Sequence, residues 1–408
     1  MLPFRFKSQL HKGCQLTCDR NMFLAAGPYF QRRFQANQWL LSNFQSAELT
    51  VSTVANLGTV LLLTNMQTGA SYPKRIIYAL TINIAGFTLL ALSTKVFTSV
   101  PAGVYFGFLM ILVFAASIAT GQLQNGIYAY VAGFGKEEYT QGIMTGQAVA
   151  GVAPPLVQII SVLSAPPAKA NMPEESSTSA MAYFLTATGI SALTLLAFLY
   201  LHGSHRNHLR SKALLEEASA RDGDPMNAAP KRRVPLTVLF RKTFWLSTAV
   251  FLTFAITMMY PVFTQKIDSV HAPSSGDIYK PASFIPLAFF FWNAGDLAGR
   301  LITAIPILRI THRARLVFIL SLCRIAWVPL YLLCNIHGKG AAVSSDFFYL
   351  FVVQLLFGLS NGYIGSLCMM GAVEYVDEDE REAAGGFMGL MLVGGLTVGS
   401  MLSFLVSV

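Results

Sequence analysis

Long apolar stretches without charged side chains constrain the fold of this chain more than any other feature. Eight stretches of at least 19 residues contain no charged residue and no His, and two further stretches, 281–308 and 316–336, are similarly long but include charged residues. A transmembrane α-helix needs about 20 apolar residues to cross the hydrocarbon. The sequence therefore predicts an all-α polytopic membrane protein with ten full spans. The eight stretches of at least 19 residues that contain no Asp, Glu, Lys, Arg or His are 49–73, 76–94, 96–135, 139–168, 176–201, 243–265, 347–373 and 383–408.

The composition excludes other broad classes of protein. Of the 408 residues, 54% are hydrophobic and 12% are charged, which is about half the charged fraction of a typical soluble protein. A β-barrel would show short alternating strands instead of long apolar runs. The five Cys residues have no spacing typical of a disulfide framework or a zinc site, so we expect free thiols.

Basic residues are unevenly distributed between the predicted loops. From residue 34 onward, alternate loops carry 16 Lys and Arg residues, whereas the intervening loops carry five. Lys and Arg accumulate in cytoplasmic loops, so the richer set is predicted to be cytoplasmic. Its longest member, residues 202–242, is a basic cytoplasmic linker between an N-terminal half, 1–201, and a C-terminal half, 243–408. The net charge of +9 then requires no nucleic-acid partner.

The N-terminal region holds one incomplete span. The charge distribution places the segment before Glu48 on the non-cytoplasmic side, although several basic residues occur within residues 1–20. Residues 21–30 (NMFLAAGPYF) are apolar, but ten helical residues cover only about 15 Å, half of the hydrocarbon core. We interpret them as the second half of a truncated first helix. An alternative or mis-assigned start is expected, with eleven helices in the parent architecture.

An acid and a base occur together in one of the charged spans. Asp296 is the only carboxylate in the middle of a predicted span, and Arg300 follows one helical turn later on the same face. Ionisable groups inside a membrane are costly and mark functional sites by default. We predict a polar cavity lined by Asn293, Asp296 and Arg300. The alternative is that the pair only joins neighbouring helices.

Amides and small residues add further candidates. Gln124 and Asn125 follow a long apolar run, and such amides bind either a ligand or a neighbouring helix. Both readings stay open, and Asn361 raises the same question. Arg324 is predicted to be structural, with a carbonyl or acidic partner. Pairs of Gly residues four apart, such as 295 with 299 and 395 with 399, indicate close helix packing.

Several motifs together resemble the equilibrative nucleoside transporter family. FWNAGDLAGRLITA at 291–304 looks like its eighth-helix signature, with the Asp and Arg four residues apart. QNGIYAYVAGFGKEEYTQGIMTGQAVAG at 124–151 is similar to its fourth-to-fifth helix region, and NMFLAAGPYF to the end of its first helix. The segments that look like its ninth, tenth and eleventh helices are RIAWVPLYLLCN at 324–335, SNGYIGSLCM at 360–369 and EREAAGGFMG at 380–389.

The resemblance implies a major-facilitator-like bundle of six plus five helices, with the first helix incomplete here. By the family pattern, Asp296 and Arg300 would hold ribose hydroxyls, and a fourth-helix amide would hold the base. That amide falls on Asn125 by spacing, with Gln124 beside it, and Leu24 matches a first-helix position near the base. The family's Pro-Trp-Asn turn is absent, because Asp19 and Arg20 precede Asn21, so its gate is not carried over.

The predicted function is facilitative transport of nucleosides or nucleobases by alternating access, with proton coupling left open. The protein would be a multi-pass protein of the plasma membrane or a vacuolar or lysosome-like membrane, without cofactor, metal or obligate protein partner. An ATP-binding GxxxxGK[ST] motif is absent. An aspartyl protease is disfavoured because it needs two membrane carboxylates. Transport of another small polar solute on the same fold, or an inactive truncated product, are the alternatives.

Overall fold

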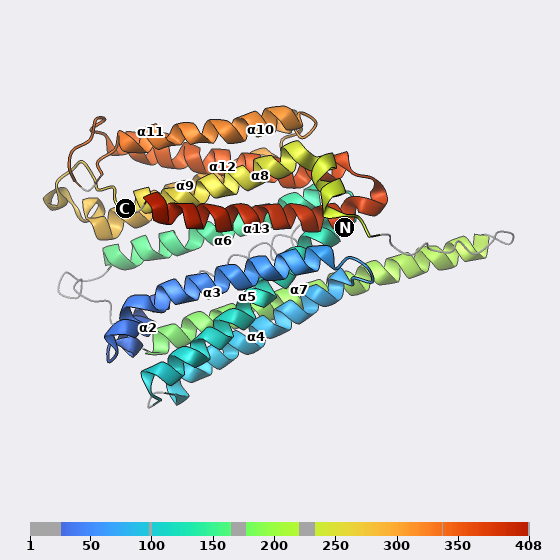
Figure 1. Ribbon diagram of the computed structural model, residues 1–408, viewed down its shortest axis with the longest axis horizontal. Coiled ribbons are helices and arrows are strands. Elements are labelled where there is room, and N and C mark those ends of the chain that lie inside the picture. Colours follow the sequence, from blue (N-terminus) through green and yellow to red (C-terminus); the bar gives the residue numbers. More distant parts are fainter. Residues whose placement is uncertain (1–25, 98–99, 165–176, 220–232, 337, 407–408) are drawn as a thin grey trace.

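The computed structural model describes residues 26–97, 100–164, 177–219, 233–336 and 338–406. Within these residues the chain forms helices and connecting turns, and its one antiparallel bridge joins Ile267 to Ile336. Figure 1 shows long helices running side by side along one direction. The all-α class predicted from the sequence is therefore confirmed.

The long helices of the first 219 residues correspond to the predicted spans. The first described element is the short α2 (Gly27–Phe34), which overlaps the segment predicted to end the first helix. It packs by Phe30 and Phe34 against the other helices of this region, since both rings are fully buried. The helices that follow are α3 (Gln38–Asn65), α4 (Tyr72–Val96), α5 (Ala102–Ala132), α6 (Glu137–Ser164) and α7 (Ser177–Ser219).

The second part of the chain adds five further spans, some of them assembled from several helical pieces. One span, Ala314–Leu332, combines α10 (Ala314–Cys323), a 3-10 turn (Arg324–Ala326) and α11 (Trp327–Leu332). Another, Phe348–Tyr375, combines a π-helical turn (Phe348–Leu355), α12 (Leu356–Gly371) and a 3-10 turn (Ala372–Tyr375). The remaining spans are α8 (Leu236–Thr264), α9 (Pro281–Ile302) and α13 (Arg381–Val406).

Among the described residues, nine helices are long and apolar enough to cross a membrane. Of the ten predicted spans, the one that does not meet this criterion is α9, which carries Asp296 and Arg300. Its 22 residues still extend about 33 Å, enough to cross the hydrocarbon. It packs against α12 and α6, and Asp296 and Arg300 are buried, so its polar face is turned toward other helices.

The connections rich in Lys and Arg lie together. Figure 1 shows the connections α3 to α4, α5 to α6, α9 to α10 and α12 to α13 at one end of the bundle, on the right in the view, where α7 also ends and α8 begins. We call this the basic end. The antiparallel course of successive helices produces this arrangement. The helix α7 continues to Ser219 and α8 begins at Leu236, so helix occupies part of the predicted linker 202–242. The division into two halves stays a prediction.

Glycines allow α9 and α12 to approach by their backbones. A Cβ atom at Gly295 or Gly299 would overlap the backbone of α12, and one at Gly358 or Gly362 would overlap the backbone of α9. The close packing predicted for the 295 and 299 pair is confirmed. The contact places the Asp296 backbone directly against α12, so side chains of α12 reach the acid.

Candidate functional site

A cavity of about 350 Å³ lies between the helices and contains most of the predicted site residues. Its volume is within the range of small-molecule sites. Polar side chains and apolar ones share its wall, with Phe254 and Trp292 contributing aromatic surface. Asn293, Asp296 and Arg300 all line it. The polar cavity predicted around these three residues is present.

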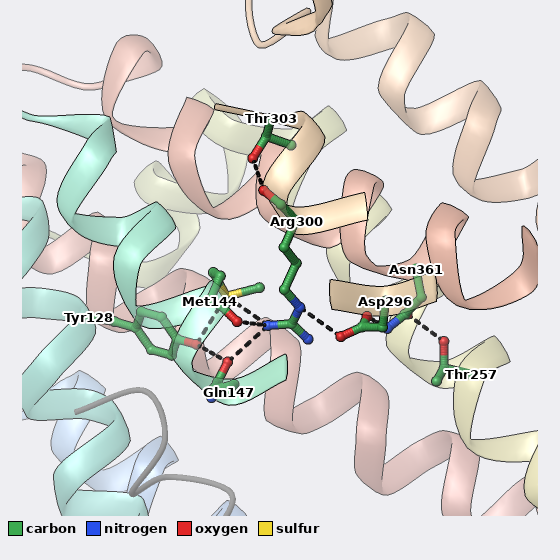
Figure 2. A network of polar contacts seen from close by, with 8 residues as sticks. All are labelled: Tyr128, Met144, Gln147, Thr257, Asp296, Arg300, Thr303 and Asn361. Carbon is green, nitrogen blue, oxygen red and sulfur yellow. Dashed lines mark hydrogen bonds and ion pairs between the residues drawn. The ribbon is translucent and has the colours of Figure 1, made fainter. Parts of the chain in front are cut away.

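Asp296 and Arg300 form a buried ion pair on α9. Arg300 Nε donates to Asp296 Oδ2 over 2.8 Å, and the two side chains are 7% and 9% exposed. The spacing of four residues places both on one face of the helix. Because the pair is desolvated, each charge depends on its partner and on further hydrogen bonds. Both sets of partners come from other helices, as Figure 2 shows.

The guanidinium of Arg300 also connects α9 to α6. Its Nη1 donates to the Met144 carbonyl oxygen over 2.6 Å and lies 3.4 Å from Gln147 Oε1. The Tyr128 hydroxyl of α5 donates to the same Gln147 oxygen over 3.1 Å. No hydrogen bond of Arg300 Nη2 is found within the described chain. That nitrogen is therefore available to an oxygen atom in the cavity (Figure 2).

The carboxylate of Asp296 is held from α12 and, through it, from α8. Asn361 Nδ2 donates to Asp296 Oδ1 over 2.6 Å, and the Thr257 hydroxyl donates to Asn361 Oδ1 over 2.7 Å. A carboxylate has about four lone-pair positions, and two are used here. The remaining positions are available to hydroxyl donors of a ligand. Asn361, which the sequence left undecided, thus belongs to this site.

The structure separates the two candidate amides of α5. Gln124 lines the cavity, and its Oε1 is buried without a hydrogen-bond partner among the described residues. Asn125 does not line the cavity, because its side chain is bound elsewhere. Arg75 Nη1 donates to Asn125 Oδ1 over 2.5 Å, and Asn125 Nδ2 donates to Thr64 Oγ1 over 3.1 Å. The geometry therefore selects Gln124 and gives Asn125 a role in helix packing.

The remaining predicted site residues differ in their surroundings. Asn293 lines the cavity, and its Nδ2 donates to the Phe289 carbonyl oxygen over 2.8 Å. Its Oδ1 lies so close to Gly151 of α6 that a Cβ atom at residue 151 would be only 2.6 Å from it. Leu24 lies outside the described residues.

One carboxylate in the cavity wall was missed from the sequence. The prediction that Asp296 is the only membrane acid is wrong, because α3 begins at Gln38 and not near residue 49. Glu48 is therefore inside a spanning helix, and it lines the same cavity as Asp296. A hydropathy pattern that extended the span upstream through Gln38 would have found it. The argument against a protease from a single membrane acid no longer holds.

Gln147 and Thr257 were also missed, because each looks like an ordinary polar residue of an apolar helix. Their partners lie 153 and 104 residues away in the sequence. Only the packing of α6 and α8 around α9 and α12 brings them to the pair. Around Asp296, the site combines its carboxylate, a guanidinium nitrogen of Arg300 and the amide oxygen of Gln124 with two aromatic side chains. This set suits an uncharged ligand with hydroxyl groups and a flat apolar part.

The sequence profile described as nucleoside transporter matches residues 109–408, which is most of the chain. Nucleoside transporter FUN26 of Saccharomyces cerevisiae is 31% identical over an alignment that covers 96% of this chain and 82% of that protein. The chain belongs to the equilibrative nucleoside transporter family. Equilibrative nucleoside transporter 1 of Rattus norvegicus is 27% identical, with 94% of this chain and 93% of that protein covered.

Family membership confirms the resemblance that the motifs indicated. The protein is a multi-pass membrane protein of a nucleoside transporter family, and not an enzyme. This membership, and not the count of membrane acids, excludes the protease.

Solved structures of the major facilitator superfamily share the fold. The proton:xylose symporter XylE superposes with a TM-score of 0.63 at 10% identity, covering 98% of this chain and 86% of that one. The transporter FucP in its outward conformation superposes with a TM-score of 0.62 at 13% identity, covering 99% and 92%. The major-facilitator-like bundle predicted from the sequence is confirmed. At this identity the similarity concerns the fold alone.

Proposed function

We propose that this protein carries nucleosides across a membrane and binds them in the central cavity. The observation that carries the proposal is the buried pair of Asp296 and Arg300, which faces a cavity of about 350 Å³. The two ribose hydroxyls of a nucleoside are vicinal, and each can donate and accept. Asp296 accepts from them, while Arg300 Nη2 donates to them.

Other polar and aromatic groups in the wall fit the base. Gln124 Oε1 is an acceptor without a partner in the described chain, and rotation of the amide toward the cavity lets an N–H group of a base or its exocyclic amine satisfy it. Trp292 and Phe254 provide apolar contact for the planar ring. The same donors and acceptors also fit other small polar solutes with vicinal hydroxyls, and the uptake experiment below compares nucleosides with such a solute.

Contacts at the basic end support alternating access. There Arg309 Nη1 pairs with Glu137 Oε2 over 2.7 Å, joining the connection after α9 to the start of α6. A Cβ atom at Gly385 of α13 would overlap the Tyr128 carbonyl oxygen of α5. These contacts join the predicted halves at that end, and opening them while closing the opposite end would pass the site from one side to the other.

The carrier is proposed to be facilitative, and the sequence contains no ATP-binding motif that would support direct ATP drive. Glu48 is the side chain in the cavity wall that would carry a coupled proton if one is used. The membrane is proposed to be the plasma membrane or a vacuolar or lysosome-like membrane, and a fluorescent fusion imaged beside markers of each decides between them.

Uptake by the purified protein in proteoliposomes tests the proposal. Radiolabelled uridine and adenosine are compared with free bases and with a hexose, and protein-free liposomes give the background. We expect saturable nucleoside uptake that a chemical gradient alone drives. Asp296→Asn abolishes it, whereas Asp379→Asn, an exposed acid in the turn before α13, does not. Saturable uptake of the hexose without nucleoside uptake would favour another solute.

A further inference from the structure

Arg324 is the largest fully buried side chain in the described part of the protein, at 1% exposure. It lies in the 3-10 turn between α10 and α11, outside the wall of the central cavity. The sequence predicted a carbonyl or acidic partner, and the partners found are different. Arg324 Nη1 donates to Ser360 Oγ over 3.1 Å, Nη2 donates to Thr257 Oγ1 over 2.8 Å, and the guanidinium lies 4.5 Å from the centre of the Phe357 ring.

A continuous series of hydrogen bonds connects Arg324 to the proposed substrate acid. It runs from Arg324 to the Thr257 hydroxyl, from there to Asn361 Oδ1 over 2.7 Å, and from Asn361 Nδ2 to Asp296 Oδ1 over 2.6 Å. The members come from four different spans. Thr257, Asn361 and Asp296 are all buried, so water does not replace any of these bonds easily. The part of the series from Thr257 to Asp296 is drawn in Figure 2.

The two charged groups at the ends of this series, the Arg324 guanidinium and the Asp296 carboxylate, set the direction of its bonds. A guanidinium can only donate, so the Thr257 oxygen must accept from it. The single hydroxyl proton of Thr257 then points away from Arg324, toward Asn361 Oδ1 and the Thr253 carbonyl oxygen, both 2.7 Å away. At the other end of the series, the Asp296 carboxylate can only accept, so the Asn361 amide keeps its NH2 group toward Asp296 and its oxygen toward the Thr257 hydroxyl. Asp296 is held as an acceptor in one orientation.

We propose that Arg324 and Thr257 are positioning residues, which orient Asp296 for ribose hydroxyls through the Asn361 amide without touching the substrate. The inference rests on the proposed role of Asp296 in nucleoside binding. It predicts that loss of the Thr257 hydroxyl frees the Asn361 amide to rotate and the carboxylate to turn, so that discrimination for hydroxylated sugars falls although the cavity keeps its shape.

The test compares KM values for uridine and 2′,3′-dideoxyuridine in proteoliposomes. Thr257→Val removes the hydroxyl and keeps the shape, and we expect the preference for uridine to fall by about tenfold, the loss that follows from one charge-assisted hydrogen bond. Thr257→Ser restores the donor and is expected to keep the wild-type ratio. Thr253→Val is the matched control, because its hydroxyl is one turn away on α8 and has no hydrogen-bond partner among the described residues.

The ratio of the KM values for uridine and 2′,3′-dideoxyuridine separates a positioning role from a general structural effect. A general structural effect changes both KM values together and leaves their ratio unchanged. If Thr257→Val does not fold, the smaller Thr257→Ala replaces it, with the same expectation. An unchanged ratio in the folded variant, or an equal fall in Thr253→Val, overturns the inference. A wild-type protein without nucleoside uptake overturns the proposed function itself, and the inference with it. Failure of the positioning role alone appears only in the variants.

Discussion

Replacement of Gln124 by Leu has opposite expected effects on the empty and the occupied protein. In the empty protein the Gln124 Oε1 atom is buried and has no hydrogen-bond partner within the described chain. Such an orphan acceptor costs about 1 to 3 kcal/mol. Leu has a similar size and no polar atom, so we expect the unfolding temperature of the empty protein to rise by about a degree rather than to fall.

The same substitution should weaken nucleoside binding. A base that donates to Gln124 recovers the cost of the orphan acceptor, and about 1.4 kcal/mol corresponds to a tenfold change in affinity. We therefore expect the dissociation constant for adenosine to rise by about tenfold to a hundredfold. Equilibrium binding of labelled adenosine to the detergent-solubilised protein measures it, with thermal unfolding recorded on the same samples.

Gln122 provides a matched control for this prediction. It lies two residues earlier on α5, its Oε1 is also buried without a partner in the described chain, and it does not line the cavity. Gln122→Leu should stabilise the empty protein in the same way and leave adenosine affinity unchanged. Equal affinity losses in both variants, or none in Gln124→Leu, would show that Gln124 does not bind the base.

Two further substitutions test other parts of the site. Glu48→Gln removes the second ionisable acid from the cavity wall, and we expect uptake measured from mildly acidic to neutral pH to lose any pH dependence the wild type shows; a retained dependence assigns coupling elsewhere. In Gly362→Ala the new Cβ atom would overlap the Asp296 carbonyl oxygen, which pushes α12 and its Asn361 away from the Asp296 carboxylate. We expect uptake to fall by about a hundredfold, the loss that follows when a binding group is misplaced by about 1 Å. Gly58→Ala, where a Cβ meets nothing within 4 Å, should leave uptake unchanged; an equal loss there refutes the packing argument.

Much of the fold was predictable because its signal is local. An apolar run of 20 residues has few stable conformations other than a spanning helix. Each of the ten predicted spans contains a helix, and Gly295 and Gly299 indicated the close contact with α12. The start of α3 was misplaced because the charged Glu48 ended the predicted stretch at residue 49, although a cavity inside the bundle accommodates its side chain.

The site was predictable where charge alone marks it and unpredictable where packing decides. Asp296 and Arg300 stand out in any apolar span. The choice between Gln124 and Asn125 depends on a bond from Arg75, 50 residues earlier in the chain. Thr257 could not have been found, because isolated Thr residues are common in membrane helices and bond to their own backbone.

Recognition of ribose hydroxyls by Asp296 is the central step of the proposed transport. The most direct test is the affinity of the wild type and of Asp296→Asn for uridine and for 2′,3′-dideoxyuridine, measured by equilibrium binding. The wild type should prefer uridine by about tenfold or more, the value of one charge-assisted hydrogen bond, and the variant should bind both ligands equally weakly. An unchanged preference in Asp296→Asn, with the variant folded, would contradict the claim.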